Sequence, residues 1–504
     1  MVLAGSNSCS ERELDLYPPS QDDIQEINSE DKLQKFLNAG YLTMGSVSGY
    51  GTDVMAIADV LSENVYVTSA KAYDLTSNMN YSALNNQTGG IYGTMYDAIM
   101  NCNLVINNTQ VGNGANVMRM KAEAKIIRAL AYFTLVNYFS PTPTSGINQE
   151  YGVPLVLGNY DSSIQPARAT VAEVYTQIIK DLNEGMQDAQ AEPAEKVLMS
   201  KTAAKLLLSR VYLTRRAAGD AQLALQHASD IVNNPTARFA PIDPAKYVEY
   251  FSGSPEINSE NQPETIWELD INTNTNLVTG LGANLALPTL YNRASGDRRA
   301  LLFTKNFFDS FPHTDLPTLP NGTPQSLSPD VRRGNTKTAA TSIPGVPNGT
   351  LPAGLMSTLT LPAVDNPAGA WTNKYPRLTS DGNFMRNIKV FRFAEAQLNR
   401  IEALFLTGQT GTALTELNAF ALSRGGSTYT GTNLLNDILT EKAKEFYGEG
   451  QRFFDIKRNN LPLVKTSNCV MNCNVPANDK LFVMPISRNA LNYNLNLKQY
   501  PGYN

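Results

Sequence analysis

The stretch SRVYLTRRAAGDAQLALQHASDIV (Ser209–Val232) decides the fold, because a second part of the chain repeats its pattern. Each copy reads as a helix, a turn that contains glycine, and a second helix with small residues where the two helices approach. The copies are separated by about 190 residues, so they are not consecutive units of one array. The second copy is NRIEALFLTGQTGTALTELNAF (Asn399–Phe420), in which Arg400 matches Arg210, Gly408 matches Gly219, and Ala413-Leu414 matches Ala224-Leu225.

Such a pair is typical of tetratricopeptide (TPR) hairpins, in which glycine breaks the chain and alanine lets two helices pack closely. Elsewhere, apolar residues follow helical spacing, and Thr170 with Glu173 predicts a capping box at one helix start. We therefore predict a mostly α-helical, TPR-containing scaffold that is one integrated globular unit. Its parts are an N-terminal helical part (21–250), a loop-rich insertion (251–385) and a C-terminal helical part (386–504).

The insertion differs in composition from the helical parts. It is rich in Pro, Gly, Asn, Thr and Ser, and Gly334–Ala370 holds only two charged residues. Short strand-like runs occur, such as ETIWELDI (Glu264–Ile271), where alternation assigns Trp267 to the core. The polar stretch Lys71–Gly90 has the same character. Loops held on a rigid frame commonly carry binding, so these segments are the predicted ligand face.

Bulk composition excludes some classes of protein. The chain has 504 residues, of which 42% are hydrophobic and 17% charged, as in ordinary soluble globular proteins. A net charge of −5 disfavours sequence-independent binding of nucleic acid, which needs a basic face. No stretch approaches the roughly 18 consecutive apolar residues that indicate a membrane-spanning helix.

The N-terminal segment predicts a tether. Residues 1–20 hold a short apolar run (Val2–Ala4), then small residues, then Cys9. This order is typical of an export signal that ends at a lipidated cysteine. We predict lipidation of Cys9 and contact with a membrane only through that anchor; the alternative is an ordinary terminal thiol.

The other cysteines predict a disulfide and a core residue. Cys469 and Cys473 lie four residues apart with no histidine nearby, which argues against a zinc site. We predict a disulfide, which would contribute about 2 kcal/mol; the alternative is two free thiols. Cys102 lies on an apolar helical stripe and is assigned to the core. We expect no metal and no cofactor.

Motifs that carry catalysis are missing from the sequence. The chain has two histidines and lacks the patterns HExxH, GxSxG and GxxxxGK[ST]. A glycosidase needs only two carboxylates about 5–10 Å apart, and no closely spaced pair in a loop indicates one. We therefore predict a protein that is not an enzyme.

A charged stretch near the C-terminus predicts a structural clamp. In EKAKEFYGEGQRFFDIKRNN (Glu441–Asn460), three glutamates recur every four residues and so share one helical face. Gly448 and Gly450 flank the last of these glutamates, and then Arg452, Asp455 and Arg458 recur every three residues. We expect these acids and guanidinium groups to pair across the bend, because arginine satisfies two acceptors in a planar fork.

The same stretch resembles the signature of the SusD/RagB family of outer-membrane lipoproteins. Four further segments resemble family motifs in the family's order, so the resemblance spans nearly the whole chain. The matching signature residues are Glu441, Glu445, Phe446, Glu449, Gly450, Arg452, Phe454, Asp455 and Arg458; the further segments are CSERELDLYPPS, MKAEAKIIRALAYFTLVNYFSPTP, FRFAEAQLNRIEAL (which departs at Arg400) and KLFVMPISRNALNYNLNLKQYPGY.

The resemblance implies a non-catalytic, lipid-anchored protein of the outer-membrane surface. Such a protein would bind an oligosaccharide and pass it to a partner TonB-dependent (SusC-like) β-barrel transporter. Two alternatives remain open: a peptide-binding lid of the same architecture, and a glycoside hydrolase. The sequence does not name the glycan.

The resemblance also implies where ligand residues lie, in the loop after the second N-terminal helix and in the insertion. Aromatic rings take the C–H faces of sugars, and amides take their hydroxyls. Alternatives are that Tyr73 and Tyr81 pin their own loop and that Trp371 packs within a strand. The candidate ligand-binding residues in these regions are Tyr73, Asn78, Tyr81, Asn85, Tyr291 and Trp371.

Overall fold

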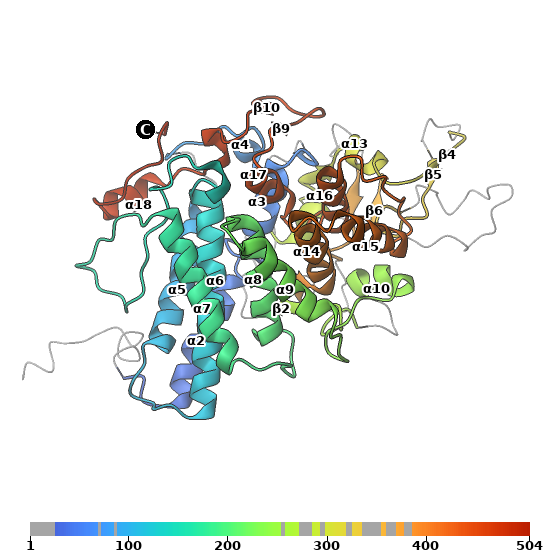
Figure 1. Ribbon diagram of the computed structural model, residues 1–504. Helices are drawn as coiled ribbons and strands as arrows, with labels where there is room; N and C mark the ends of the chain where they lie inside the picture. The colour runs from blue at the N-terminus through green and yellow to red at the C-terminus, as the bar shows by residue number, and fades with distance from the viewer. Residues whose placement is uncertain are drawn as a thin grey trace, which may run out of the picture.

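The computed structural model describes most of the chain and shows a helical body with short strands (Figure 1). The described residues are 26–68, 72–84, 88–253, 258–271, 285–292, 298–318, 325–334, 354–358, 369–376 and 386–503. The helices are α2 (Glu30–Met44), α3 (Asp53–Leu61), α4 (Asp74–Ser77), α5 (Gly89–Ile106), α6 (Ala115–Phe139), α7 (Val171–Asp188), α8 (Lys201–Arg215), α9 (Asp220–Val232), α10 (Tyr247–Ser252), α12 (Leu287–Tyr291), α13 (Lys305–Asp309), α14 (Phe393–Leu406), α15 (Thr410–Ser423), α16 (Leu434–Glu445), α17 (Arg452–Arg458) and α18 (Arg488–Tyr493).

The strands are short and pair in antiparallel twos. The pairs are β1 (Val65–Val67) with β3 (Leu301–Phe303), β2 (Thr265–Leu269) with β8 (Ile388–Arg392), β4 (Thr314–Leu316) with β5 (Gln325–Leu327), β6 (Met356–Ser357) with β7 (Trp371–Thr372), and β9 (Leu463–Val464) with β10 (Asn474–Val475). The prediction of a mostly α-helical fold with short strands is confirmed.

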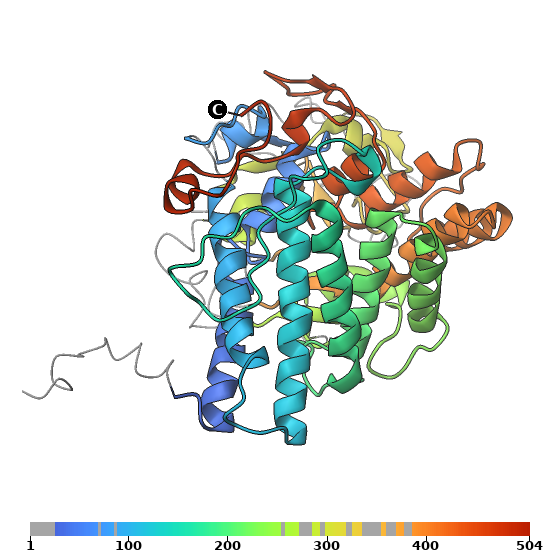
Figure 2. The same ribbon diagram turned by 60° about the vertical axis from the view of Figure 1, so that its left-hand side comes forward.

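The N-terminal helices form the main body. α2, α5, α6, α7 and α8 stand side by side (Figure 2), and α6 packs against α5 on one side and α7 on the other. α6 is buried along nearly its whole length, as expected of a helix that is apolar on most sides. Thr170 and Glu173 form the predicted capping box at the start of α7. Cys102 is a buried free cysteine of α5, as predicted, and burial raises its pKa to about 12.

The two sequence repeats form neighbouring helical hairpins. α8–α9 and α14–α15 are the pairs, and α14 packs against α9 although the insertion separates them in sequence. The turns contain Gly219 and Gly408, with φ angles of +85° and +81°, a conformation that favours glycine. Ala224 and Ala413 are fully buried where the helices meet. The prediction of TPR hairpins is confirmed.

The two ends of the insertion are joined by the β2–β8 pair. β2 lies near the start of the insertion, and β8 lies just after its end. Trp267 of β2 is fully buried with its ring edge against Tyr50, which confirms its assignment to the core.

A buried cluster of ion pairs fastens the insertion to the C-terminal helices. The clamp glutamates accept from cations of other segments. Arg332 donates to Glu441 at 2.6 Å and Lys374 donates to Glu449 at 2.7 Å. Because Arg332 and Lys374 belong to the insertion, this cluster fixes its position. The other cations in the cluster are Arg392, which binds Glu445 and Glu449, and Arg424, which binds Glu445.

This arrangement corrects one expectation. The acids and arginines of the stretch do not mainly pair with each other across the bend. Arg452 pairs with Glu63 at 2.7 Å, and Arg458 pairs with Glu402 as well as with the predicted Asp455. The stretch is a clamp as predicted, but it holds distant segments together because its bend is packed against them.

Candidate functional site

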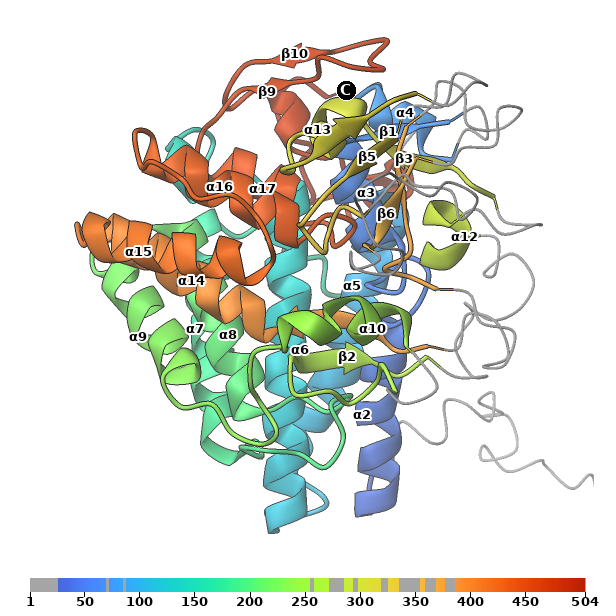
Figure 3. The same ribbon diagram turned by 90° about the vertical axis from the view of Figure 1, so that its right-hand side faces the viewer.

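The predicted ligand segments lie together on one side of the molecule. Figure 3 shows α4, β1, β3, β6 and α12 on the side opposite α9 and α15 of the TPR hairpins. We call this side the loop face, formed by residues 72–84, α12 and the β6–β7 ribbon. An antiparallel bridge between Phe303 and Ala370 joins that ribbon to the β1–β3 pair. The loop face therefore has a short-stranded support beneath it.

Two predicted ligand residues instead anchor the loop face to α3. Tyr73 is buried, and its hydroxyl donates to Asp53 Oδ1 at 2.7 Å. Tyr291 is fully buried, and its hydroxyl donates to Asp59 Oδ2 at 2.7 Å. Its ring stacks on Phe303 with centroids 5.7 Å apart. These rings hold α4 and α12 in place and present no free face to a ligand.

The anchoring carboxylates are themselves perturbed. Burial raises the pKa of Asp53 to about 6 and that of Asp59 to about 7, although both accept hydrogen bonds. Gly450 N–H also donates to Asp59 Oδ1 at 3.1 Å. Sequence reasoning missed these two residues, yet two acids within the apolar helix DVMAIADVL (Asp53–Leu61) were a signal of buried polar anchors.

Tyr81 is also buried. Its hydroxyl donates to the backbone carbonyl of Leu481, and its ring lies 6.2 Å from that of Tyr503. Tyr73, Tyr81 and Tyr291 are thus all buried and hydrogen-bonded within the protein. Because each hydroxyl has a partner within the protein, pinning the loop is energetically favoured.

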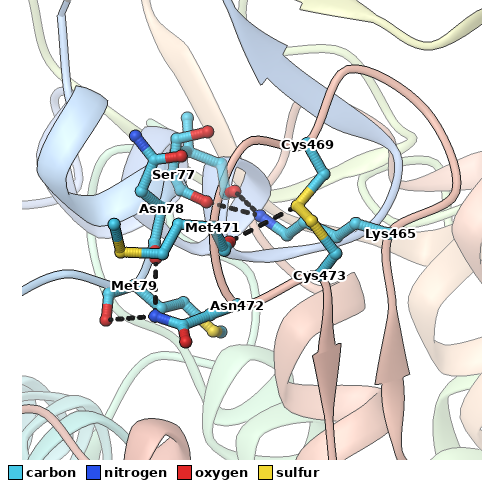
Figure 4. Close-up of a disulfide and its surroundings, with 9 residues drawn as sticks. Ser77, Asn78, Met79, Lys465, Cys469, Met471, Asn472 and Cys473 are labelled. Carbon is cyan, nitrogen blue, oxygen red and sulfur yellow. Dashed lines mark hydrogen bonds between the residues drawn. A yellow bond between two sulfur atoms is a disulfide. The ribbon is translucent and has the colours of Figure 1, made fainter.

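The predicted Asn78 lies where a disulfide hairpin supports the loop face (Figure 4). Cys469 and Cys473 are joined in a disulfide between β9 and β10. Within that loop, Asn472 Nδ2 donates to the Asn78 carbonyl at 2.9 Å. Asn78 itself is half-buried.

A buried lysine at the base of the hairpin adds a second link. Lys465 Nζ donates to the carbonyls of Val60 and Ser77 at 2.9 and 3.0 Å. Burial lowers the pKa of Lys465 to about 8. The hairpin thus ties α3 and the end of α4 together from outside.

Trp371 is the candidate aromatic residue that is partly exposed on the loop face. It lies on β7, opposite Ser357 of β6, and is half-buried. The next residue, Thr372, is fully buried, so alternation along the strand directs Trp371 away from the core. Asn85 and Cys9 lie outside the described residues.

The described part of the chain shows neither a cluster of metal ligands nor a membrane-spanning helix. It holds no group of three or more His, Cys, Asp or Glu that could bind a metal ion. Across those same residues, no helix combines the length and the hydropathy needed to cross a membrane.

The geometry defines a TPR-containing scaffold protein with a strand-and-loop face on the side away from its hairpins. Two family models match the sequence. One, described as "Starch-binding associating with outer membrane", covers residues 14–213, and the other, described as the SusD family, covers residues 362–503. The chain belongs to the SusD/RagB family.

Solved structures share this fold along nearly the whole chain. A SusD superfamily protein from Bacteroides thetaiotaomicron is 24% identical, with a TM-score of 0.76 over 94% of this chain and 100% of that one. A SusD-like carbohydrate binding protein from Bacteroides vulgatus is 18% identical, with a TM-score of 0.71 over 94% and 98%. Surface glycan-binding protein A from Bacteroides uniformis is 19% identical, with a TM-score of 0.65 over 93% and 99%. No curated protein matches the chain.

Proposed function

We propose that this protein is a non-catalytic lipoprotein of the outer-membrane surface that binds an oligosaccharide on its loop face. It delivers that glycan to a partner TonB-dependent β-barrel transporter. The family matches carry the proposal, because the model that matches residues 14–213 is described as starch-binding and associating with the outer membrane, and the model that matches residues 362–503 is that of the SusD family. Two proteins of the same fold are named for carbohydrate or glycan binding.

The loop face suits weak, reversible capture. Trp371 offers an aromatic ring for the C–H face of a sugar, and Asn78 offers an amide for its hydroxyls. Each net hydrogen bond contributes about 0.5–1.5 kcal/mol. With one ring and few hydrogen bonds, we expect dissociation constants of about 0.1–1 mM, equivalent to about −5.5 to −4 kcal/mol. Such affinities permit release to a transporter.

The disulfide supports a location outside the cytoplasm. The Cys469–Cys473 bond persists in oxidising compartments and is rare in reducing ones. We propose that Cys9 carries the lipid anchor.

Four buried carboxylates are each unsuited to act as a general acid. Surrounding cations hold the pKa of Glu402 and Glu445 well below the usual range, so neither is suited to donate a proton. Asp53 and Asp59 have the raised pKa values of a general acid. However, both carboxylates are buried and accept hydrogen bonds from the hydroxyls of Tyr73 and Tyr291.

Affinity gel electrophoresis tests the proposal. Native gels that contain soluble starch, xylan, galactomannan or inulin should include one that retards the wild-type protein. Trp371→Ala should reduce the retardation, whereas Leu422→Ala should not, because Leu422 is an exposed residue of α15 on the TPR side. Retardation by none of the polysaccharides, together with retention on a peptide column, would favour the peptide-binding alternative. Release of reducing ends from any of them would establish hydrolysis.

A further inference from the structure

A hollow lies beside α5, and part of its wall comes from α18, whose first residue, Arg488, donates to the Ala83 carbonyl of the loop face at 2.9 Å. The hollow is bounded by α5, by residues 154–166 and by the C-terminal residues 490–497, and its volume is about 470 Å³. We call it the α5 hollow. None of its lining residues belongs to α4, α12 or β6–β7, and its size falls in the range of roughly 300–1,000 Å³ typical of small-molecule sites.

The wall of the α5 hollow is fixed by side-chain amides. Asn103 Nδ2 donates to the carbonyls of Val156 and Gly158 at 2.9 and 2.8 Å. Asn107 Nδ2 donates to the Leu157 carbonyl at 2.9 Å. Asn494 Nδ2 donates to the Pro166 carbonyl at 2.8 Å. The Tyr96 hydroxyl donates to the Pro154 carbonyl at 2.8 Å. Residues 154–166 are therefore held as a preformed wall, which lowers the entropic cost of binding.

Two of the lining residues, Gly93 and Gly158, are glycines with room for a side chain. A Cβ atom added to Gly93 or to Gly158 would meet no other atom within 4 Å, so neither glycine is required by close packing. Gly93 lies inside α5, where glycine costs about 1 kcal/mol relative to alanine.

The lining combines apolar surface with hydrogen-bond acceptors. The ring of Tyr160 is 70% exposed at the rim, and Leu155 and Met100 contribute apolar wall. Asp97 is an exposed residue of α5 that lines the hollow, and partial desolvation raises the pKa of its carboxyl. Asp161 adds a second carboxylate, which accepts from Ser163. Carboxylates accept hydrogen bonds and repel anions, so this surface suits a neutral ligand with an apolar face and hydroxyl donors.

We propose that the α5 hollow is a second oligosaccharide site, in which Tyr160 stacks on a sugar ring and Asp97 accepts from its hydroxyls. The choice of a glycan rests on the proposed function. A second site would let one molecule hold a polymer at two points and so raise its avidity without new contacts at the first site.

Variants in a Trp371→Ala background test the second site. The probe is maltohexaose where starch retards the protein, or the hexasaccharide of whichever polysaccharide does, and binding is measured by isothermal titration calorimetry. Trp371→Ala alone should keep measurable binding. Adding Gly93→Leu, which fills the hollow, should lower the remaining association constant at least about tenfold. Adding Gly411→Leu should leave it unchanged, because Gly411 is an exposed glycine of α15 with open space around it.

The outcomes separate the two proposals. Complete loss of binding with Trp371→Ala alone overturns the second site and leaves the proposed function intact. If Tyr160→Ala abolishes glycan binding in the wild-type background and Trp371→Ala does not, the result supports the second site. It also overturns the proposal that the loop face binds glycan. Equal binding in the Gly93→Leu and Gly411→Leu variants overturns the second site. Absence of glycan binding in the wild-type protein overturns both proposals. Melting temperatures within about 1 °C of the parent confirm that each variant is folded.

Discussion

Replacing Arg332 with methionine should destabilise the protein more than any surface ion pair could. Arg332 is fully buried and donates to Asp330 Oδ2 at 2.7 Å and to Glu441 Oε1 at 2.6 Å. Methionine fills similar space without charge, so both acids would be left buried without their main partner. Breaking a buried pair in this way costs about 3–5 kcal/mol.

The expected change in melting temperature follows from the size of the chain. For 504 residues that unfold as a unit, 1 kcal/mol corresponds to about 1 °C. Arg332→Met should therefore lower the melting temperature in differential scanning calorimetry by about 3–5 °C. Because Arg332 links the insertion to α16, limited proteolysis should also cleave the insertion faster than in the wild-type protein.

A matched control uses a pair near the surface. Arg400 binds Glu416 at 2.8 Å, and the two side chains are 19% and 29% exposed. Pairs of this kind contribute at most about 1 kcal/mol, so Arg400→Met should change the melting temperature by no more than about 1 °C. Adding Glu441→Gln to Arg332→Met should recover part of the loss, because it removes an unpaired charge. Equal effects of Arg332→Met and Arg400→Met would refute the buried clamp.

Of three further predictions, two concern the supports of the loop face and one concerns the cap of α7. The double variant Cys469→Ser/Cys473→Ser should lose about 2 kcal/mol of stability. It should also bind glycan more weakly, because Asn472 no longer holds Asn78. Unchanged affinity in calorimetry would show that the hairpin is irrelevant to binding. Burial raises the pKa of Asp59 to about 7, so the folded protein keeps a proton that the unfolded chain has lost. The free energy of unfolding should therefore fall by about 2 kcal/mol between pH 5.5 and pH 8, as Asp59 loses this proton in the folded state. Asp59→Asn should remove most of that fall in melting temperature, and an equally steep profile would contradict the assignment. Thr170→Ala should cost about 1 kcal/mol through loss of the cap of α7, which lowers the melting temperature by about 1 °C. The control Thr176→Ala, on the exposed side of the same helix, should change the melting temperature less. Equal shifts in the two variants would argue against the cap.

Sequence reasoning succeeded where a pattern repeats along the chain. Helical spacing and the matched positions of Gly219 and Gly408 predicted the TPR hairpins, and strict alternation placed Trp267 in the core. The four-residue spacing correctly placed Glu441 and Glu445 on one face of α16, but Glu449 lies in the turn that follows, because the helix ends at Glu445. The spacing could not show which cations reach the clamp glutamates, because Arg332 and Lys374 approach from a segment whose path only the folded structure defines.

The ligand residues were harder to predict. Tyr73, Tyr81 and Tyr291 lie in polar or irregular segments, where no periodicity separates a ring that faces solvent from one that anchors a loop. Their burial depends on acceptors far away in sequence, such as Asp53 for Tyr73. Trp371 differs because its strand neighbour Thr372 is buried, which gives its direction.

Binding of glycan at the loop face, with the sugar left intact, can be followed through the tryptophan side chains. The chain has only two tryptophans, and Trp267 is fully buried. In ¹⁹F NMR of protein labelled with 5-fluorotryptophan, titration with the oligosaccharide should move the Trp371 resonance with a dissociation constant of about 0.1–1 mM. The Trp267 resonance should stay in place, and the sugar should be recovered intact. A stationary Trp371 resonance while glycan binds, or a cleaved sugar, would contradict the account.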